Sequence, residues 1–281
     1  VARLGEQHFW VNTTSGGADR VALAFEEWLQ CEYVHHRVLV TPVTSAWGNV
    51  TVAGPKAWAL LQAAGFDPSL APTAMKHMTL RETMFGGVAM RVLRASFSGE
   101  LGYEINLPAG HTAALLDRLS QVGQAFGVVP YGVEALMILR LEKGYLHLGA
   151  DTDGTSFPGD VGLDRGIAKK AANFVGRRSL QRPVATDAER MQLVGLLPQD
   201  RCTRLPVGAH ITPQPPPAAI DGYVTSSAFS PVLGHPVALA MLRRGRQRVG
   251  ERLTAYHLGR PIAVEVVTTP FFDPAGERLH G

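Results

Sequence analysis

Cysteine is scarce in this chain, and long apolar runs are missing. The 281 residues include only two cysteines, Cys31 and Cys202, which lie far apart. This spacing excludes a disulfide framework or a cysteine metal cluster, and it fits a reducing compartment, so we expect a cytoplasmic protein. No apolar run approaches the roughly 20 residues needed to cross a bilayer. The chain also opens without a basic segment followed by an apolar one, so we expect neither membrane insertion nor secretion.

The usual signatures of metal and dinucleotide sites are also missing. The ten histidines form no H-x-x-x-H or similar pair. The run from Asp151 to Gly154, DTDG, matches half of a calcium loop, but no glutamate follows at the required offset. No G-x-G-x-x-G motif followed by a distant acid occurs. We therefore expect neither a metal site nor a dinucleotide site within this chain.

The net charge of +3 is small, and one cluster of arginines stands out, at positions 243, 244, 246 and 248. Such a cluster could contact nucleic acid or a tail of glutamate residues on a ligand. It could equally be a solvated turn between two strands. We favour the turn, because a basic hairpin without interleaved aromatic residues is weak evidence for nucleic-acid binding, and we expect no nucleic-acid partner.

The first two thirds of the chain mix strand and helix patterns. The composition, 46% hydrophobic and 18% charged, suits two or three packed cores. Two β-branched runs between Arg37 and Ala53 predict strands, and a short helix follows over Lys56–Ala64. A hairpin is predicted from Val88–Phe97 and Tyr103–Leu107, and a helix from His111 to about Phe126. This order indicates an α+β fold.

From Met191 onward the pattern becomes all-β. Short β-rich runs alternate with Gly/Pro turns at roughly ten-residue spacing, which is typical of a barrel or sandwich. We predict a hairpin tip at Gln214–Pro217 and a linker over the polar segment Arg182–Arg190. The predicted domains are therefore residues 1–182 and 190–281.

Two further segments carry candidate functional groups. The segment Thr13–Gly17, TTSGG, precedes an amphipathic helix whose inner face includes Leu23 and Trp28, with Thr14 or Ser15 as its N-cap. The glycines suit either a plain helix entry or close approach of a ligand. In the hairpin, Glu100 and Glu104 could form an acid/base pair, but we favour a structural role on a solvated surface.

The segment Tyr131–Thr155, YGVEALMILRLEKGYLHLGADTDGT, has the strongest functional signal. Its first half is too apolar for a surface helix, so we expect it to be largely buried. Glu142 would then lie at the wall of a core, where an ionised carboxylate needs hydrogen-bond donors, such as two parallel N–H groups of a ligand. Alternatively, Glu142 is exposed at a frayed helix end capped by Gly144. The residues alone leave both alternatives open.

Three runs of sequence closely resemble the aminomethyltransferase family, whose type member is the T-protein of the glycine-cleavage system. They are RLEKGY with LGADTDGT (residues 140–155), FSGELGYEINLP (97–108) and IAKKAANFVGRRSL (167–180). Within the family, the sequence looks most like the C-terminal domain of sarcosine oxidase alpha chains. The resemblance implies a tetrahydrofolate-binding T-protein-like fold with a C-terminal all-β barrel.

The resemblance also implies which residues contact folate. Glu142 matches the glutamate that holds the pterin ring, whose exocyclic amino group and ring N–H suit a bidentate carboxylate. Thr13 falls where T-proteins have a folate-contacting asparagine. Ala135 stands where they have a tyrosine and the sarcosine oxidase alpha chains a threonine, so a polar contact is lost. Lys170 belongs to the basic turn expected near the glutamate tail, although Ala171 replaces a usual third basic residue.

The implied function is tetrahydrofolate-dependent one-carbon transfer within a sarcosine-oxidase-like complex, yielding 5,10-methylenetetrahydrofolate. The position of the family's catalytic aspartate would precede Val1, so no catalytic residue is assigned. FAD, FMN or NAD is expected only on sequence outside this chain or on partner subunits, which would be other sarcosine oxidase subunits. The alternative is a non-catalytic folate-binding or scaffold module of a flavin amine oxidase.

Overall fold

The computed structural model describes residues 1–213 and 219–281, which form two compact units. The sheet unit consists of Val1–Ser96, Glu100–Pro130 and Arg278–Gly281, and the barrel unit of Phe97–Gly99 and Tyr131–Glu277. Residues 131–190 therefore cluster with the barrel, and our domain boundary at 182–190 stays a prediction. The predicted hairpin tip at 214–217 lies outside the described residues.

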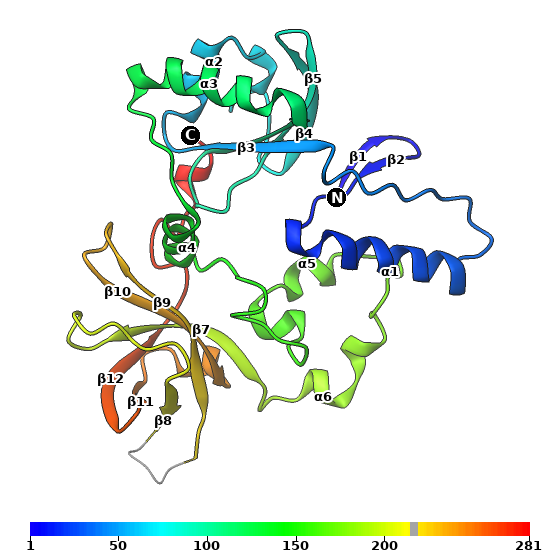
Figure 1. Cartoon of the computed structure of the whole chain (residues 1–281). Coiled ribbons are helices and arrows are strands. Elements are labelled where there is room, and N and C mark those ends of the chain that lie inside the picture. Colours follow the sequence, from blue (N-terminus) through cyan, green and yellow to red (C-terminus); the bar gives the residue numbers. More distant parts are fainter. Residues whose placement is uncertain (214–218) are drawn as a thin grey trace. The chain divides into compact units, whose positions relative to one another are not determined.

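The sheet unit is built on a four-stranded antiparallel sheet in the order β3-β6-β5-β4. Its strands are β3 (Trp47–Ala53), β4 (Thr79–Phe85), β5 (Val88–Arg94) and β6 (Gly102–Pro108). Helices α2 (Ala57–Ala64) and α3 (Thr112–Gly123) cover one face (Figure 1). The predicted hairpin and both predicted helices are thus confirmed, and the first unit is α+β.

Alternating side chains create the core between this sheet and its helices. In β6, Tyr103, Ile105 and Leu107 point inward and are fully or almost fully buried. The Tyr103 hydroxyl donates to the Leu70 carbonyl oxygen at 3.0 Å, which satisfies the polar end of a buried ring. Leu61 of α2 packs into the same core. Burial of this apolar face is what fixes the register of the sheet.

The other face of the sheet is polar and aromatic. The Arg91 guanidinium lies 4.5 Å from the Trp10 ring centroid and 4.7 Å from that of Trp47, and it pairs with Glu82 at 3.0 Å. Glu104 lies within β6 on this face, and burial raises the pKa of its carboxyl. Glu104 is therefore partly buried, so the expectation of a solvated surface holds only in part, and its structural role stays a prediction.

Some local predictions in the sheet unit fail. A hairpin of β1 (Ala2–Gly5) and β2 (His8–Trp10) precedes helix α1 (Ala18–Cys31). The N-cap of α1 is Gly17, so the prediction of Thr14 or Ser15 is wrong. None of the described residues of α1 is buried, and Leu23 of its predicted inner face is 70% exposed. Residues 37–46, which we expected to form a strand, contain none in the described structure.

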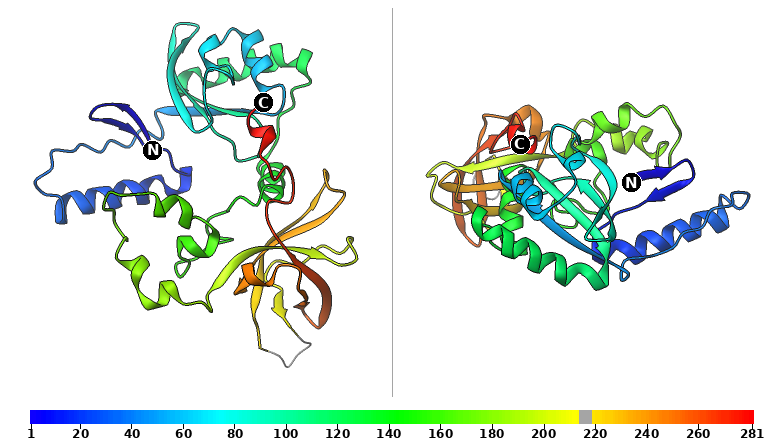
Figure 2. Two further views of the ribbon diagram at one scale, coloured as in Figure 1. Left: turned by 180° about the vertical axis from the view of Figure 1, so that it is seen from behind. Right: turned by 90° about the horizontal axis from the view of Figure 1, so that it is seen from above.

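The barrel unit contains a closed six-stranded antiparallel barrel in the order β10-β7-β12-β11-β8-β9, drawn in yellow to red in Figures 1 and 2. Its strands are β7 (Met191–Pro198), β8 (His210–Thr212), β9 (Gly222–Ser230), β10 (His235–Arg243), β11 (Arg252–His257) and β12 (Arg260–Val267). Inward residues such as Leu196, Ile211 and Val264 are fully buried. The barrel prediction is confirmed. The arginine cluster begins at the end of β10 and continues through the turn before β11, as the predicted turn between two strands requires.

Three helices lie between the sheet unit and the barrel strands in the chain. They are α4 (Val133–Glu142), α5 (Asp164–Ala168) and α6 (Pro183–Thr186), and α4 packs against β9 and β10. Only the last turn of α4 is buried, and Val133 at its start is 71% exposed. The expectation that the helix is largely buried therefore holds for its last turn alone. Across residues 1–213 and 219–281, no helix combines the length and apolar character that crossing a membrane requires.

The end of α4 is fixed by a Schellman motif. The Tyr145 amide donates to the Arg140 carbonyl oxygen at 2.8 Å, and the Gly144 amide donates to that of Leu141 at 2.9 Å. Gly144 has φ +64°, a left-handed conformation that favours glycine. A Cβ at this position would lie 2.7 Å from the Thr269 Cβ. The close packing of the segment around Thr269 therefore also requires glycine here.

We expect Gly144→Ala to destabilise the protein by about 2–4 kcal/mol, combining left-handed strain with steric overlap at Thr269. Gly149→Ala is a matched control, because Gly149 has φ +89° and its added Cβ would meet nothing within 4 Å. It should cost only about 1 kcal/mol. Urea unfolding of both variants measures the difference, and equal losses would contradict the steric component.

Glu104 makes stability depend on pH. Because burial raises the pKa of its carboxyl, the folded chain binds this proton more tightly than the unfolded chain, and stability falls as the pH rises from the unfolded to the folded pKa. Glu104→Gln removes this titration and keeps an oxygen that can accept from Asn12 Nδ2, now at 3.4 Å. The variant should be more stable than wild type in urea unfolding at pH 7 and equally stable below about pH 3.5. A constant difference at both pH values would contradict this origin.

Candidate functional site

The carboxylate of Glu142 lies in a buried position between α4 and the barrel. The residue is 2% exposed, and the Ser230 hydroxyl at the end of β9 donates to Glu142 Oε1 at 2.5 Å. Its backbone is held as well, because the amides of Phe271 and Phe272 donate to the Glu142 carbonyl oxygen at 2.9 and 3.0 Å. Of our two sequence alternatives, the Gly144 cap is correct, and the exposed position of Glu142 is wrong.

Within the described part of the chain, Ser230 is the only side chain that donates to the Glu142 carboxylate. A carboxylate has about four acceptor positions on its two oxygens, and a single neutral donor leaves most of them available. An ionised group in such a position gains from further donors. This arrangement can accept hydrogen bonds from a ligand that presents N–H groups.

The next residue, Lys143, does not neutralise Glu142. Its Nζ donates to the Asp273 backbone oxygen at 2.6 Å and to Oδ2 of the same residue at 3.1 Å, and both side chains are almost fully buried. The Lys143 stem lies against Gly99, where a Cβ would come within 2.1 Å of Lys143 Cγ. Gly99 has φ +85°. Gly99, the first glycine of the FSGELGY run, therefore makes room for Lys143 of the RLEKGY run.

Arg140, two residues before Glu142, is held through both of its terminal nitrogens, while its Nε has no partner among the described residues. Its Nη1 lies 2.6 Å from Asp151 Oδ2, and its Nη2 donates to Ser226 Oγ at 2.8 Å. The hydroxyls of Thr225 and Ser226 both donate to Asp151 Oδ1 at 2.6 Å, and the His147 amide donates to Oδ2 at 2.8 Å. This buried network attaches the last turn of α4 and the DTDG loop to β9.

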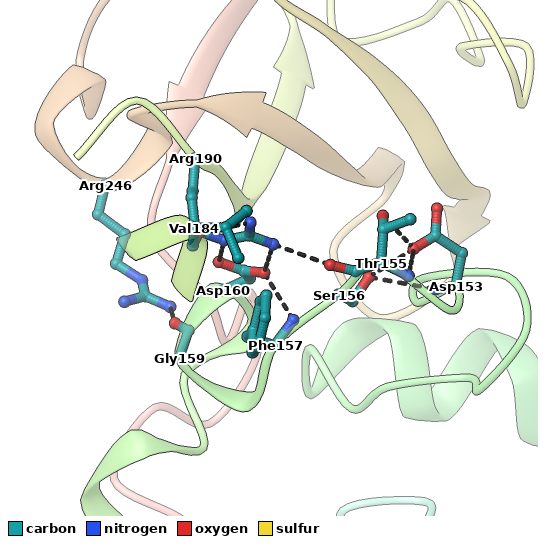
Figure 3. Close-up of polar contacts among 9 residues, drawn as sticks. All are labelled: Asp153, Thr155, Ser156, Phe157, Gly159, Asp160, Val184, Arg190 and Arg246. Atoms are coloured by element: carbon teal, nitrogen blue, oxygen red, sulfur yellow. Dashed lines mark hydrogen bonds and ion pairs between the residues drawn. The ribbon is translucent and has the colours of Figure 1, made fainter. Parts of the chain in front are cut away.

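The loop after Asp151 is held by further polar contacts (Figure 3). Asp160 forms a bidentate pair with Arg190, at 2.8 Å to Nε and 2.6 Å to Nη2, and the Arg190 guanidinium lies 4.5 Å from the Phe157 ring centroid. Asp153 Oδ1 accepts from the amide and hydroxyl of Thr155 at 2.8 and 2.7 Å. Over the described ranges, no group of three or more His, Cys, Asp or Glu is placed to hold a metal.

The other predicted site residues lie elsewhere. Thr13 belongs to the sheet unit, where it is exposed and its hydroxyl donates to the Thr14 backbone oxygen at 2.8 Å. Ala135 is exposed in the first turn of α4, two turns before Glu142. Lys170 is exposed after α5, with its Nζ 5.8 Å from the Phe174 ring centroid. Their roles in binding remain predictions.

Sequence reasoning missed the partners that surround Glu142. Ser226 and Ser230 lie on β9, more than 80 residues from Arg140 and Glu142 of α4, with which they form hydrogen bonds. One signal was available. The run YVTSSAFS in β9 places several hydroxyl residues in succession in a strand of a packed barrel, and buried hydroxyls need partners.

Comparisons with known proteins agree with this architecture. The family described as "GCVT N-terminal domain" matches residues 1–171, and "Glycine cleavage T-protein C-terminal barrel domain" matches residues 191–273. The chain is 37% identical to sarcosine oxidase subunit alpha of Corynebacterium sp. (strain U-96) over 285 residues, covering 99% of this chain and 29% of that subunit. It is equally similar, at 37% identity over 286 residues, to the alpha subunit of Rhizobium meliloti, again covering 99% of this chain and 29% of the subunit.

A solved structure extends the comparison to the fold. The aminomethyltransferase T of the Bartonella henselae glycine cleavage system superimposes with a TM-score of 0.75 at 26% identity, covering 91% of this chain and 66% of that one. The chain thus spans less than a third of the length of its sarcosine oxidase relatives and most of the T-protein fold. It belongs to the aminomethyltransferase family typified by the glycine-cleavage T-protein.

Proposed function

We propose that this chain binds tetrahydrofolate and serves in one-carbon transfer within a sarcosine-oxidase-like complex, with 5,10-methylenetetrahydrofolate as the product. The main support is the environment of Glu142. Its carboxylate is buried, has one neutral donor, and lacks a cationic partner among the described side chains. The pterin edge offers an amino group and a ring N–H side by side, which match the two carboxylate oxygens.

The chemistry divides between the folate and the protein. When bound, tetrahydrofolate supplies two amine nitrogens that together accept a one-carbon unit. Glu142 would anchor the pterin ring and so determine where those nitrogens lie, which is a contribution to orientation rather than to bond breaking. Oxidation of the methylated amine would require a flavin, which we expect on other sequence or on partner subunits.

A second function is favoured by a specific observation. Ala135 presents only an exposed methyl group on α4, so it makes no polar contact of the kind that the tyrosine or threonine of relatives could provide. A chain that binds folate weakly and transfers nothing would be a binding or scaffold module of a flavin amine oxidase complex. For either function we propose a cytoplasmic setting, other subunits of such a complex as partners, and no nucleic-acid partner.

Titration calorimetry with tetrahydrofolate tests the proposal. Glu142→Gln keeps the shape of the side chain but replaces one acceptor by a donor, so it should weaken binding by about 100-fold or more, because each charge-assisted hydrogen bond contributes ~1.5–3 kcal/mol. Glu134→Gln, on the exposed first turn of the same helix, is the matched control and should bind as wild type does. Equal binding by wild type and Glu142→Gln would overturn the folate proposal.

Product analysis separates transfer from simple binding. The assay uses the complete complex, with sarcosine as the methylated amine. The transfer function predicts 5,10-methylenetetrahydrofolate in the presence of tetrahydrofolate, and Glu142→Gln should shift the product towards free formaldehyde. If the folate binds but free formaldehyde remains the product of the wild-type complex, the scaffold alternative is correct.

A further inference from the structure

We infer that Ser230 is a positioning residue that orients the Glu142 carboxylate for its ligand before the ligand arrives. Ser230 has no exposed surface, and the group its hydroxyl meets is the Glu142 carboxylate, so we assign it a role through Glu142. It lies on β9, whereas Glu142 ends α4, and their hydrogen bond at 2.5 Å joins residues 88 positions apart. This inference rests on the proposed function and assigns a role within the same site.

The hydrogen bonds around Ser230 determine the direction of its proton. The Leu233 amide donates to Ser230 Oγ at 3.0 Å, so one lone pair of the hydroxyl oxygen is already occupied. The hydroxyl hydrogen is then free to point at Glu142 Oε1, 2.5 Å away. Ser230 therefore acts as a donor towards Glu142.

The backbone of Glu142 is already fixed, so the remaining freedom lies in its side chain. The Phe271 and Phe272 amides and the Schellman motif hold the main chain on both sides of the carbonyl. Without Ser230, the carboxylate could rotate about its side-chain bonds, and a bidentate ligand would have to order it on binding. With Ser230 in place, that entropy is lost during folding, and the ligand meets an oriented pair of oxygens.

A two-donor ligand should depend on this orientation more than a one-donor ligand. Ser230→Ala should weaken tetrahydrofolate binding about tenfold, the equivalent of ~1.4 kcal/mol. A tetrahydrofolate analogue with a 2-methyl group in place of the 2-amino group keeps the ring N–H but lacks the second donor. Its affinity should fall less than about threefold in the same variant, since one hydrogen bond tolerates a rotated carboxylate. Ser230→Thr, which restores the hydroxyl, should recover most of the tetrahydrofolate affinity.

Ser227→Ala is the matched control. Ser227 is another buried serine of β9, and its hydroxyl has no hydrogen-bond partner within the described residues. Its substitution should leave both affinities unchanged. All binding is measured well below the thermal midpoint of each variant. If Ser230→Ala does not fold, Ser230→Cys, which has a weaker donor of similar size, replaces it and should give an intermediate loss.

The outcomes distinguish this inference from the proposed function. If Glu142→Gln weakens binding as expected, equal losses in Ser230→Ala for tetrahydrofolate and its 2-methyl analogue, or no loss for either, would overturn the positioning role of Ser230 alone. Unchanged binding in Glu142→Gln would instead overturn the folate proposal itself. A lower thermal midpoint in Ser230→Ala with an unchanged dissociation constant would show that the serine is purely structural.

Discussion

The buried ion pair between Arg140 and Asp151 is the interaction on which the candidate site depends. Both side chains are almost completely excluded from solvent, where an unpaired charge costs several kcal/mol. Their pairing, completed by Thr225 and Ser226, attaches the last turn of α4 to β9. Because Glu142 follows Arg140 by only two residues, its position is determined by this attachment.

The three charged residues at the end of α4 differ in how their charges are balanced. Arg140 has Asp151, and Lys143 has Asp273, as oppositely charged partners. Within the described structure, the Glu142 carboxylate has only the neutral hydroxyl of Ser230. The helix dipole adds no compensation, since negative charge is unfavourable at a helix C-terminus. A ligand that brings hydrogen-bond donors is therefore the natural complement of Glu142.

The sequence alone could predict what depends on local patterns. The alternation of β6, the regular turns of the barrel and the glycine cap at Gly144 are each encoded within a few residues. The strand β4 was not anticipated, because its run TLRETMF is largely exposed and lacks the apolar face that reveals a strand. The partners of Arg140 and Glu142 on β9 depend on chain closure over more than 80 residues, which no local pattern records.

A comparison of Glu104 with Glu142 shows why burial alone does not identify a binding carboxylate. Glu104 lies on a sheet face where Asn12 Nδ2 donates to its carboxylate at 3.4 Å, and burial raises the pKa of its carboxyl. That environment favours the neutral acid. Glu142 instead receives a short hydrogen bond from a hydroxyl whose oxygen is already engaged by an amide, and its main chain is held by two further amides. An oriented and incompletely satisfied carboxylate is the combination that recognition of a paired N–H edge requires.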